Sequence, residues 1–316
     1  MMPMQVTNKT IGPFVKWAGG KSQLIPELEK RFPRGFGKTI RKYAEPFVGG
    51  GALLFHVLSN YDVEEVFIND LNSELVCTYR FIRDDVESLI GMLEAFQVEY
   101  IPLGNEERKE YYYAKRERFN DLKRANALTV EIAALFIFIN RTCFNGLYRV
   151  NAKGDYNVPM GAYSNPRICD HALLRADSMA LKKVSINCGD YRDSDAFIDS
   201  GTFAYFDPPY RPLNVTSSFN SYDKDEFNDD SQRKLAEYIR HLSEKGAFVL
   251  ASNSDPKNTN PDDDFFDDLY KGLHVERVLA KRMINSKTEG RGSITEIVIH
   301  NYDVDIAADP NQPELL

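Results

Sequence analysis

The sequence lacks most of the features that mark secreted, membrane-spanning or metal-binding proteins. Its four cysteines form no C-x-x-C pair and are too few to staple 316 residues with disulfides; they are Cys77, Cys143, Cys169 and Cys188. The five histidines show no ligand spacing, so we expect no bound metal. No apolar run approaches the roughly 18 residues that a membrane helix needs, and residues 1–20 carry no signal-peptide core. We therefore expect a protein of a reducing cytosol with no membrane partner.

An excess of basic residues is also missing, since the net charge is −8 and the isoelectric point is about 5.3. Taken alone, this balance argues against a nucleic-acid partner. The charges are segregated, however. Residues 8–42 carry nine Lys or Arg against two acidic residues, residues 141–187 carry seven against three, and residues 190–230 reverse the balance with ten acidic against three basic. A ligand responds to the local electrostatic field rather than to the net charge of the protein. Two interpretations therefore remain: a basic DNA-binding face, or the simpler one of solvated surfaces of both signs.

The most informative segment is DPPY, formed by Asp207, Pro208, Pro209 and Tyr210 directly after the apolar run 203–206. A short buried strand would carry it to the carboxyl end of a sheet, where open α/β folds bind ligands. An exocyclic amine such as N6 of adenine is a poor nucleophile, because its lone pair is delocalised into the ring. Two acceptors, the Asp207 carboxylate and the Pro208 carbonyl, would favour a pyramidal nitrogen, and Tyr210 would stack on the base. The alternative is an ordinary Asp-Pro turn.

A second pattern is the glycine-rich turn EPFVGGGA, from Glu45 to Ala52. Such a turn lets a cofactor approach backbone N–H groups and the start of a helix. Asp70 follows Gly51 by nineteen residues, a spacing typical of a carboxylate that binds ribose hydroxyls. The dinucleotide fingerprint is incomplete, because Leu54 stands at its third glycine position. A cofactor with a ribose but no phosphate, such as S-adenosylmethionine, fits this pattern, and a nicotinamide dinucleotide stays open as an alternative.

Upstream, the only tryptophan, Trp17, precedes a Gly-Gly-Lys turn that ends in Lys21. This lysine does not belong to a triphosphate-binding loop, because no glycine stands six residues before it, where that motif requires its first glycine. A flexible turn with a solvated lysine is the simpler interpretation of this segment.

Apolar periodicity predicts a mixed α/β chain with a helical interruption. We predict helices over 21–32, 52–59, 71–82, 86–96, 106–123, 130–140 and 226–244, strands over 43–47, 65–68, 184–187, 203–206 and 247–251, and a closing hairpin of 274–279 and 294–301 joined by 287–293. Residues 142–165 predict an ordered functional loop or hairpin. Residues 211–225 are rich in Ser, Asn and Thr and predict either a lid or a disordered connection.

Taken together, the motifs resemble the Dam-like adenine-N6 DNA methyltransferases, including the modification enzymes of GATC-cleaving restriction systems. The resemblance runs from about residue 14 to residue 301 and rests on KWAGGK at 16–21, EPFVGGGA at 45–52, NDLN at 69–72, NRTCFNGLYRVN at 140–151, YNVP at 156–159 and DPPY at 207–210. It implies an α/β fold: a Rossmann-like S-adenosylmethionine-dependent methyltransferase sheet with an inserted, mainly helical DNA-recognition domain. The implied divisions are the cofactor-binding part of the catalytic domain (1–83), the target-recognition domain (84–165), the DPPY part of the catalytic domain (166–302) and a flexible tail (303–316).

The resemblance also implies which residues act in catalysis and cofactor binding. The residues that would hold S-adenosylmethionine are Trp17, Lys21, Glu45, Pro46, Phe47, Gly49, Gly51, Asp70, Asp190, Tyr191 and Asp207. Asp190 and Tyr191 look like the pair that contacts the adenine of the cofactor. The catalytic segment would be Asp207, Pro208, Pro209 and Tyr210, and the product S-adenosylhomocysteine. Because the sulfonium methyl is already activated, direct in-line displacement onto N6 of a flipped-out adenine needs no metal.

Reading of double-stranded DNA falls, by the same resemblance, on Lys16 and on one loop. The residues are Lys16, Phe144, Asn145, Leu147, Arg149 and Pro159. Arg149 has the geometry for two hydrogen bonds to guanine, and Phe144 can wedge into a base stack. The alternatives are a surface salt bridge for Arg149 and loop packing for Leu147 and Pro159.

The resemblance further implies a bacterial cytosolic enzyme acting on GATC, with a cognate restriction endonuclease acting on the same site without direct contact. We expect a monomer, because one active site suffices. The other interpretations are cytosine-N4 methylation, for which Ser is more usual at the position of Asp207, and protein-glutamine methylation, for which Asn is usual there. A DNA-binding regulator without catalysis and a nicotinamide dehydrogenase remain as candidates from other classes.

Overall fold

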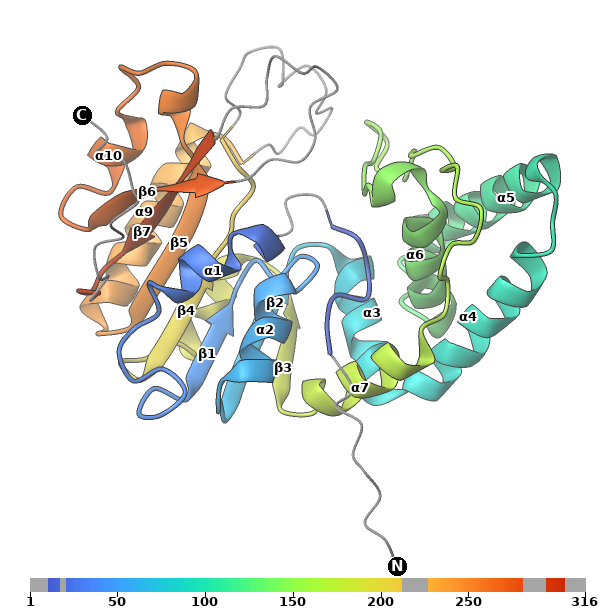
Figure 1. Ribbon diagram of the computed structural model, residues 1–316, viewed down its shortest axis with the longest axis horizontal. Coiled ribbons are helices and arrows are strands. Elements are labelled where there is room, and N and C mark those ends of the chain that lie inside the picture. The colour runs from blue at the N-terminus through green and yellow to red at the C-terminus, as the bar shows by residue number, and fades with distance from the viewer. Residues whose placement is uncertain (1–10, 18–20, 212–226, 281–293, 305–316) are drawn as a thin grey trace, which may run out of the picture.

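A seven-stranded sheet forms the centre of the computed structural model, which describes residues 11–17, 21–211, 227–280 and 294–304 (Figure 1). The strands are β1 (Lys42–Glu45), β2 (Glu65–Asp70), β3 (Val184–Cys188), β4 (Thr202–Phe206), β5 (Phe248–Ser254), β6 (His274–Ala280) and β7 (Ile294–His300). Their order across the sheet is β3-β2-β1-β4-β5-β7-β6. Strands β1 to β5 are parallel, and β7 runs antiparallel between β5 and β6. The predicted Rossmann-like α/β sheet is thereby confirmed.

Helices of the described residues cover the sheet and extend beyond it. The α-helices are α1 (Ile25–Glu29), α2 (Ala52–Asn60), α3 (Ser73–Asp84), α4 (Val86–Tyr100), α5 (Asn105–Arg124), α6 (Val130–Thr142), α7 (His171–Leu181), α9 (Asp229–Glu244) and α10 (Phe265–Leu269). The short 3₁₀ turns are η1 (Lys21–Gln23), η2 (Phe144–Gly146), η3 (Tyr191–Ala196) and η4 (Pro256–Asn258). None of the helices in this part of the chain is long and apolar enough to cross a membrane.

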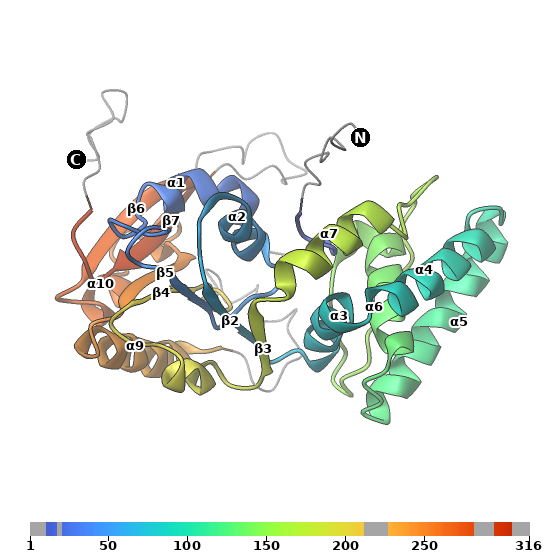
Figure 2. The same ribbon diagram turned by 90° about the horizontal axis from the view of Figure 1, so that it is seen from below.

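Both faces of the sheet are buried, as the alternation along β4 shows. Phe203 and Tyr205 belong to one apolar cluster and Ala204 and Phe206 to another, since successive side chains of a strand point to opposite faces. Helices α1 and α2 cover the first face and α9 covers the second (Figure 2). A strand that is buried on both faces reads as a continuous apolar run, which is the pattern of 203–206 in the sequence.

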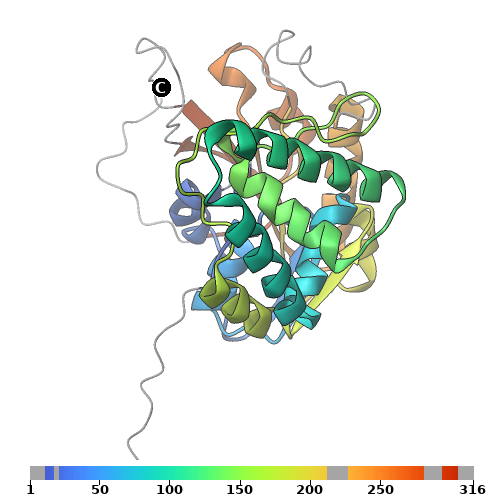
Figure 3. The ribbon, with the colours of Figure 1, turned by 90° about the vertical axis from the view of Figure 1, so that its right-hand side faces the viewer.

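The predicted helical interruption lies between β2 and β3, where α4, α5 and α6 pack beside one another (Figure 3). Helix α6 is buried along nearly its whole length, from Ile132 to Asn140, and packs against α3, α4 and α5. A helix that is apolar on all sides belongs in the interior of such a layer. The apolar cluster that covers one face of the sheet continues into these helices. The predicted boundaries at 83 and 165 stay a prediction.

Two local predictions were wrong. The single helix predicted over 21–32 is instead the turn η1 followed by the short helix α1, because Pro26 lacks an N–H donor and occupies the first turn of α1. Helix α7 was not predicted at all. Of the predicted tail, Asp303 and Val304 are described, and the rest lies outside the described residues, as does the predicted hairpin connection over 287–293.

The order of the strands sets where a ligand binds. β1 pairs with β2 on one side and with β4 on the other, so the chain connections leave β1 in opposite directions. Open parallel sheets bind ligands at the carboxyl ends of the two strands that flank such a reversal. Here these ends carry Glu45, at the end of β1, and Asp207, directly after β4.

Candidate active site

Asp207 lies at the centre of a polar cluster at the carboxyl end of β4. Its Oδ1 atom is 3.0 Å from the ammonium nitrogen of Lys21 and accepts a hydrogen bond of 3.1 Å from the hydroxyl of Ser252 on β5. The Ser252 hydroxyl is itself 2.8 Å from the hydroxyl of Tyr205 on β4. The carboxylate is therefore held in place from two strands and from η1.

Burial raises the pKa of Asp207 to about 6, and the positive charge of Lys21 opposes this rise. Burial also raises the pKa of Glu45 well above its usual range, with the charge of Asp207 adding to the effect while a hydrogen bond of 2.9 Å from the Tyr43 hydroxyl opposes it. Two carboxyl groups with raised pKa values at one sheet edge are typical of a functional site rather than of a structural ion pair.

The hydroxyl of Tyr210 is hydrogen-bonded to two charged residues of the cluster. Its hydroxyl donates a hydrogen bond of 2.6 Å to Oε2 of Glu296 on β7 and accepts one from the ammonium of Lys21. That ammonium also lies 3.8 Å from the centre of the Tyr210 ring, a cation–π contact. Burial raises the pKa of Tyr210 well above its usual range, so the hydroxyl keeps the proton that it donates.

The two prolines of the tetrapeptide differ in their surroundings. The Pro209 carbonyl accepts a hydrogen bond of 3.2 Å from the side-chain amide of Gln232 on α9, whose oxygen in turn accepts one from Asn253. Pro208 is buried, and no described residue donates a hydrogen bond to its carbonyl. The Pro208 carbonyl can thus accept a hydrogen bond from a ligand, because no other described residue uses it.

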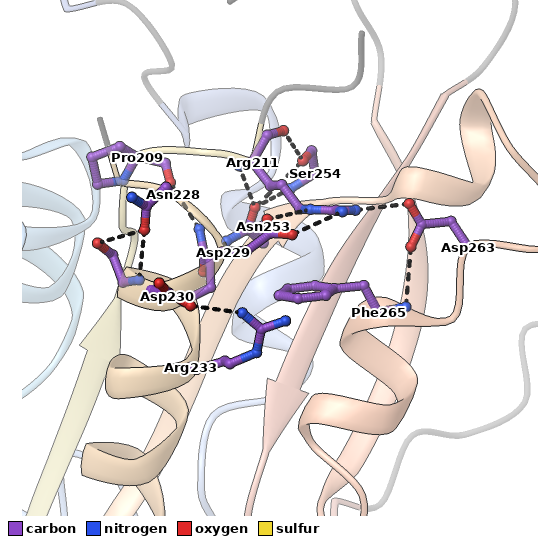
Figure 4. A network of polar contacts seen from close by, with 12 residues as sticks. Pro209, Arg211, Asn228, Asp229, Asp230, Arg233, Asn253, Ser254, Asp263 and Phe265 are labelled. Carbon is purple, nitrogen blue, oxygen red and sulfur yellow. Dashed lines mark hydrogen bonds and ion pairs between the residues drawn. The ribbon is translucent and has the colours of Figure 1, made fainter. Parts of the chain in front are cut away.

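Arg211 anchors the chain as it leaves the tetrapeptide (Figure 4). Its guanidinium pairs with Asp229 at 2.8 Å and with Asp263 at 2.8 Å, and it lies over the ring of Phe265. The Arg211 backbone N–H donates to Asn253, and its carbonyl accepts from Ser254. These contacts fix the geometry of DPPY from its far side. The rest of the lid predicted over 211–225 lies outside the described residues.

The glycine turn after β1 requires glycine at two positions. Gly49 and Gly51 have φ values of 48° and 72°, in the left-handed region. A Cβ atom on Gly51 would lie 2.4 Å from the Tyr79 hydroxyl, and one on Gly49 would lie 2.8 Å from the indole nitrogen of Trp17. Trp17 therefore lies directly on the turn. Residues 18–20 of the KWAGGK motif lie outside the described residues.

Asp70 and Asn69 hold this turn against the ends of β2 and β3. The Asp70 carboxylate accepts hydrogen bonds of 2.9 Å from the backbone N–H groups of Gly49 and Asn72, and burial raises its pKa. The buried side chain of Asn69 donates to the carbonyls of Pro46 and Gly189. The carboxyl ends of three neighbouring strands are thus tied together beside the turn.

Phe47, Tyr191 and Asp190 complete the edge of the sheet. The rings of Phe47 and Tyr191 stack with their centres 5.3 Å apart, and Tyr191 is buried. Asp190 begins η3 and pairs with Arg192, which lowers the pKa of the Asp190 carboxyl. Among the described residues, no three acidic, histidine or cysteine side chains are grouped so that they could hold a metal ion.

This donor set fits S-adenosylmethionine. Acidic side chains lie at the carboxyl ends of the neighbouring strands, where negative charge favours a sulfonium cation and opposes the pyrophosphate of a dinucleotide. They are Asp70 at the end of β2, Asp190 after β3 and Asp207 after β4. Glu45, at the end of β1, adds less charge, because burial raises its pKa. An aspartate at the end of β2 has the type and position expected of a ribose acceptor, and the rings of Phe47 and Tyr191 at the same edge of the sheet suit an adenine.

The predicted DNA-reading residues lie together on a separate surface. Asn140 at the end of α6 binds the backbone of Lys16 through both its side-chain atoms, and it also donates to the Gly146 carbonyl. A Cβ atom on Gly146 would lie 2.4 Å from Cβ of Lys16, so the lysine stem packs on the turn η2. The Lys16 ammonium is exposed and donates to the Tyr163 hydroxyl at 3.0 Å.

The loop that follows α6 presents the other five. Phe144, Asn145, Arg149 and Pro159 are exposed, whereas Leu147 is half-buried. The Phe144 N–H donates to the Pro159 carbonyl at 2.9 Å, and Arg149 donates from Nε to the side chain of Asn157 at 2.7 Å. Two isolated bridges, Cys143 to Met160 and Val150 to Tyr156, hold the loop as a hairpin, which confirms the ordered loop predicted over 142–165.

Comparison with known proteins decides what this arrangement is. The model of the D12 class N6 adenine-specific DNA methyltransferases matches residues 17–284. The chain belongs to this family. It is 47% identical over 294 residues to the Type II methyltransferase M.MjaIII of Methanocaldococcus jannaschii, covering 92% of this chain and 99% of that protein.

Two further relatives extend the similarity to other organisms. The Type II methyltransferase M1.LlaDCHI of Lactococcus lactis subsp. cremoris is 38% identical over 301 residues, which are 95% of this chain and 98% of that protein. The DNA adenine methylase of Escherichia coli K12 is 31% identical over 285 residues, 90% of this chain and 93% of that protein.

Membership of the adenine-specific DNA methyltransferases decides among the alternatives that the sequence left open. The protein is an enzyme that methylates adenine in DNA, so cytosine-N4 methylation, protein-glutamine methylation, a regulator without catalysis and a nicotinamide dehydrogenase are set aside.

Two polar residues of the methyltransferase site were missed from the sequence. Ser252 lies in β5 and Glu296 in β7, and both contact the DPPY segment. Glu296 stands in the mainly apolar strand β7 with a side chain that is only 14% exposed, and Ser252 begins the polar end, Ser-Asn-Ser, of β5. A carboxylate within an apolar strand pattern was the one available signal, because charged residues are rarely buried without a partner.

Proposed function

We propose that this methyltransferase transfers the methyl group of S-adenosylmethionine to N6 of an adenine flipped out of duplex DNA, and that its target is GATC. S-adenosylmethionine supplies an activated sulfonium methyl; the N6–carbon bond forms as the carbon–sulfur bond breaks, which leaves S-adenosylhomocysteine. The methylated nitrogen then gives up one N–H proton through the Asp207 carboxylate to solvent. The observation that carries the proposal is the position of Asp207, a half-buried carboxylate at the sheet reversal beside the buried residue Pro208.

In this proposal Asp207 and Pro208 accept the two N–H bonds of the adenine amine. The lone pair of N6 is then free to attack in line, because the nitrogen becomes pyramidal. The ammonium of Lys21 keeps the Asp207 carboxylate ionised, and Tyr210 stacks on the base. Flipping the adenine costs a few kcal/mol of lost stacking and pairing, which the Tyr210 ring and the phosphate contacts offset.

The methyl donor is held, in this proposal, at the glycine turn. Asp70 binds the ribose, Phe47, Asp190 and Tyr191 surround the adenine of the donor, and Trp17 covers the turn. The remaining members of the proposed donor site are Lys21, Glu45, Pro46, Gly49, Gly51 and Asp207. What supports this assignment is the anionic character of the edge and the close packing of Trp17 on Gly49.

DNA is read, in the same proposal, by the surface formed by Lys16, Phe144, Asn145, Leu147, Arg149 and Pro159. The contact between Lys16 and Gly146 supports treating these residues as one unit, since it joins the start of the chain to the loop. The enzyme acts as a monomer in the bacterial cytosol and protects GATC sites from a cognate restriction endonuclease that it does not contact.

The test is methyl transfer from labelled S-adenosylmethionine to two duplexes that differ only in the presence of GATC or of the same bases scrambled. After digestion to nucleosides, we expect label in N6-methyl-2′-deoxyadenosine from the GATC duplex alone. Equal labelling of both duplexes would refute the proposed target, and label in methylcytosine would refute the proposed chemistry.

A further inference from the structure

Glu296 reaches the active site from the strand that closes the sheet. It lies on β7, where it pairs with Ser254 of β5 on one side and with Val278 of β6 on the other. Its Oε2 atom accepts the 2.6 Å hydrogen bond of the Tyr210 hydroxyl and lies 3.8 Å from the Lys21 ammonium. Two carboxylates, those of Glu296 and Asp207, therefore share one buried ammonium.

We propose that Glu296 is a positioning residue for methyl transfer: it fixes the ring of Tyr210 and shares the Lys21 ammonium with Asp207, so that Lys21 stays beside Asp207 while that carboxylate keeps an oxygen for the adenine amine. This inference rests on the proposed roles of Asp207 and Tyr210 as the acceptor and the stacking ring.

The shared ammonium is the physical reason. Lys21 lies 3.0 Å from Oδ1 of Asp207, which also accepts the Ser252 hydroxyl, and no described residue donates a hydrogen bond to Oδ2. A carboxylate accepts several hydrogen bonds, so the incoming amine binds Asp207 while Lys21 keeps its place. Two buried carboxylates of like charge are costly without a cation between them, and the Lys21 ammonium is that cation. Glu296 therefore holds Lys21 and Tyr210 in position beside Asp207.

The contact with Tyr210 has a second consequence. A hydrogen bond from a hydroxyl to a carboxylate is short and about twice as strong as one between neutral groups. It fixes the ring at its outer end, while the network around Arg211 fixes the backbone at the other (Figure 4). The stacking surface for the base is thus set before DNA arrives.

The same geometry predicts an electrostatic signature. The groups that face Asp207 are Lys21 from η1, Ser252 from β5, Tyr205 from β4, Glu45 from β1, the hydroxyl of Tyr210 and Glu296 from β7. Among them, the negative charge of Glu296 raises the pKa of Asp207. Removing that charge lowers the pKa of Asp207, which a residue with only a packing role would not do.

The experiment compares the full-length enzyme with Glu296→Gln, which keeps the shape of the side chain and removes its charge. At pH 7.5, with DNA and S-adenosylmethionine saturating, we expect kcat to fall about tenfold, the order of one lost charge-assisted hydrogen bond. The acidic limb of the pH profile of kcat/KM moves to lower pH. Glu244→Gln, at an exposed glutamate that ends α9, is the matched control and keeps wild-type kinetics.

A second variant tests the same contact from the other side. Tyr210→Phe keeps the ring and removes the hydroxyl, so we expect it to lower kcat as well. The loss of kcat in the double variant should be smaller than the product of the two single losses, because both changes remove the same interaction. Wild-type kcat in Glu296→Gln or in Tyr210→Phe, or a loss of activity with an unmoved acidic limb, would overturn the inference.

Asp207→Ala in the same assay distinguishes a failure of the role inferred for Glu296 from a failure of the role proposed for Asp207. If Asp207→Ala is inactive while Glu296→Gln behaves as wild type, only the positioning role of Glu296 fails. If Asp207→Ala is fully active, the proposed role of Asp207 itself fails, and with it the basis of this inference.

Discussion

The ammonium of Lys21 lies 3.0 Å from the carboxylate of Asp207 and joins the start of the chain to the DPPY segment. Two opposing effects act on that carboxylate. Burial raises its pKa to about 6, while the charge of Lys21 holds the pKa below what burial alone would give. The acceptor thus changes its protonation state within the range in which such an enzyme is assayed.

The first prediction concerns the pH dependence of methylation. Only the ionised Asp207 can accept the N–H bond of the adenine amine, so kcat/KM is lost as pH falls through about 6 and reaches a plateau above about 7. Replacing Lys21 with Met removes the charge that lowers this pKa, and the acidic limb moves to higher pH. A profile that stays flat from pH 5 to pH 8 would contradict the role given to Asp207.

The second prediction concerns Asp70 and the methyl donor. Asp70→Ala removes the proposed ribose acceptor and the support of the Gly49 N–H, so we expect the Kd for S-adenosylhomocysteine to rise about tenfold or more. Trp17 is the only tryptophan and packs on the same turn, so its fluorescence reports the titration without a label. Asp62→Ala, at an exposed position before β2, serves as the control. Unchanged affinity in Asp70→Ala would place the donor elsewhere.

The third prediction concerns Arg149. Its exposed guanidinium is held by Asn157 in the loop after α6, where a pair of hydrogen bonds to guanine is within its reach. Arg149→Ala should reduce the preference for GATC over a scrambled duplex by about 1–3 kcal/mol. Lys153→Ala, at another exposed basic residue of the loop, should weaken binding to both duplexes equally. If Arg149→Ala also weakened binding to both duplexes equally, Arg149 would contact a phosphate rather than a base.

The fourth prediction concerns stability rather than activity. Asp177 on α7 is fully buried; one oxygen accepts the Gly12 N–H at 3.0 Å, and the other has no hydrogen-bond partner among the described residues. Burial raises its pKa to about 8, above the value of about 4 in the unfolded chain. The unfolded state therefore ionises first, so the carboxyl lowers the free energy of unfolding by about 1.4 kcal/mol per pH unit between about 4 and 8.

Asp177→Asn removes this titration while keeping an acceptor for Gly12. In urea unfolding measured from pH 5 to pH 8, the variant should lose less stability with rising pH than the wild type does. Parallel curves for the two proteins would show that Asp177 does not titrate in this range.

Much of the fold follows from the sequence, because the central strands predicted over 203–206 and 247–251 are short apolar runs, as expected where a sheet buries both of its faces. The helices around 86–96, 106–123 and 130–140 were likewise predicted within a few residues of α4, α5 and α6. Helix α7 was not predicted, because the segment before it shows no apolar periodicity that would mark where a helix begins. Its signal was Asp170, an N-cap whose side chain accepts the N–H of Leu173.

The candidate site divides in the same way. Asp207, Asp70 and the glycine turn were predicted, since each directly follows an apolar strand at a spacing that the chemistry requires. Glu296 and Ser252 were not, because their contact with DPPY depends on the strand order β4-β5-β7, which apolar periodicity does not encode. The pairing of Lys21 with Asp207 is likewise a tertiary contact without a local signal.

The most direct test of the central claim is a crystal structure of the enzyme with a non-reactive analogue of S-adenosylmethionine and a GATC duplex. We predict one adenine outside the base stack, with N6 about 3 Å from both the Asp207 carboxylate and the Pro208 carbonyl. An adenine that remains stacked in the duplex, or an extruded adenine whose N6 lies far from both oxygens, would contradict it.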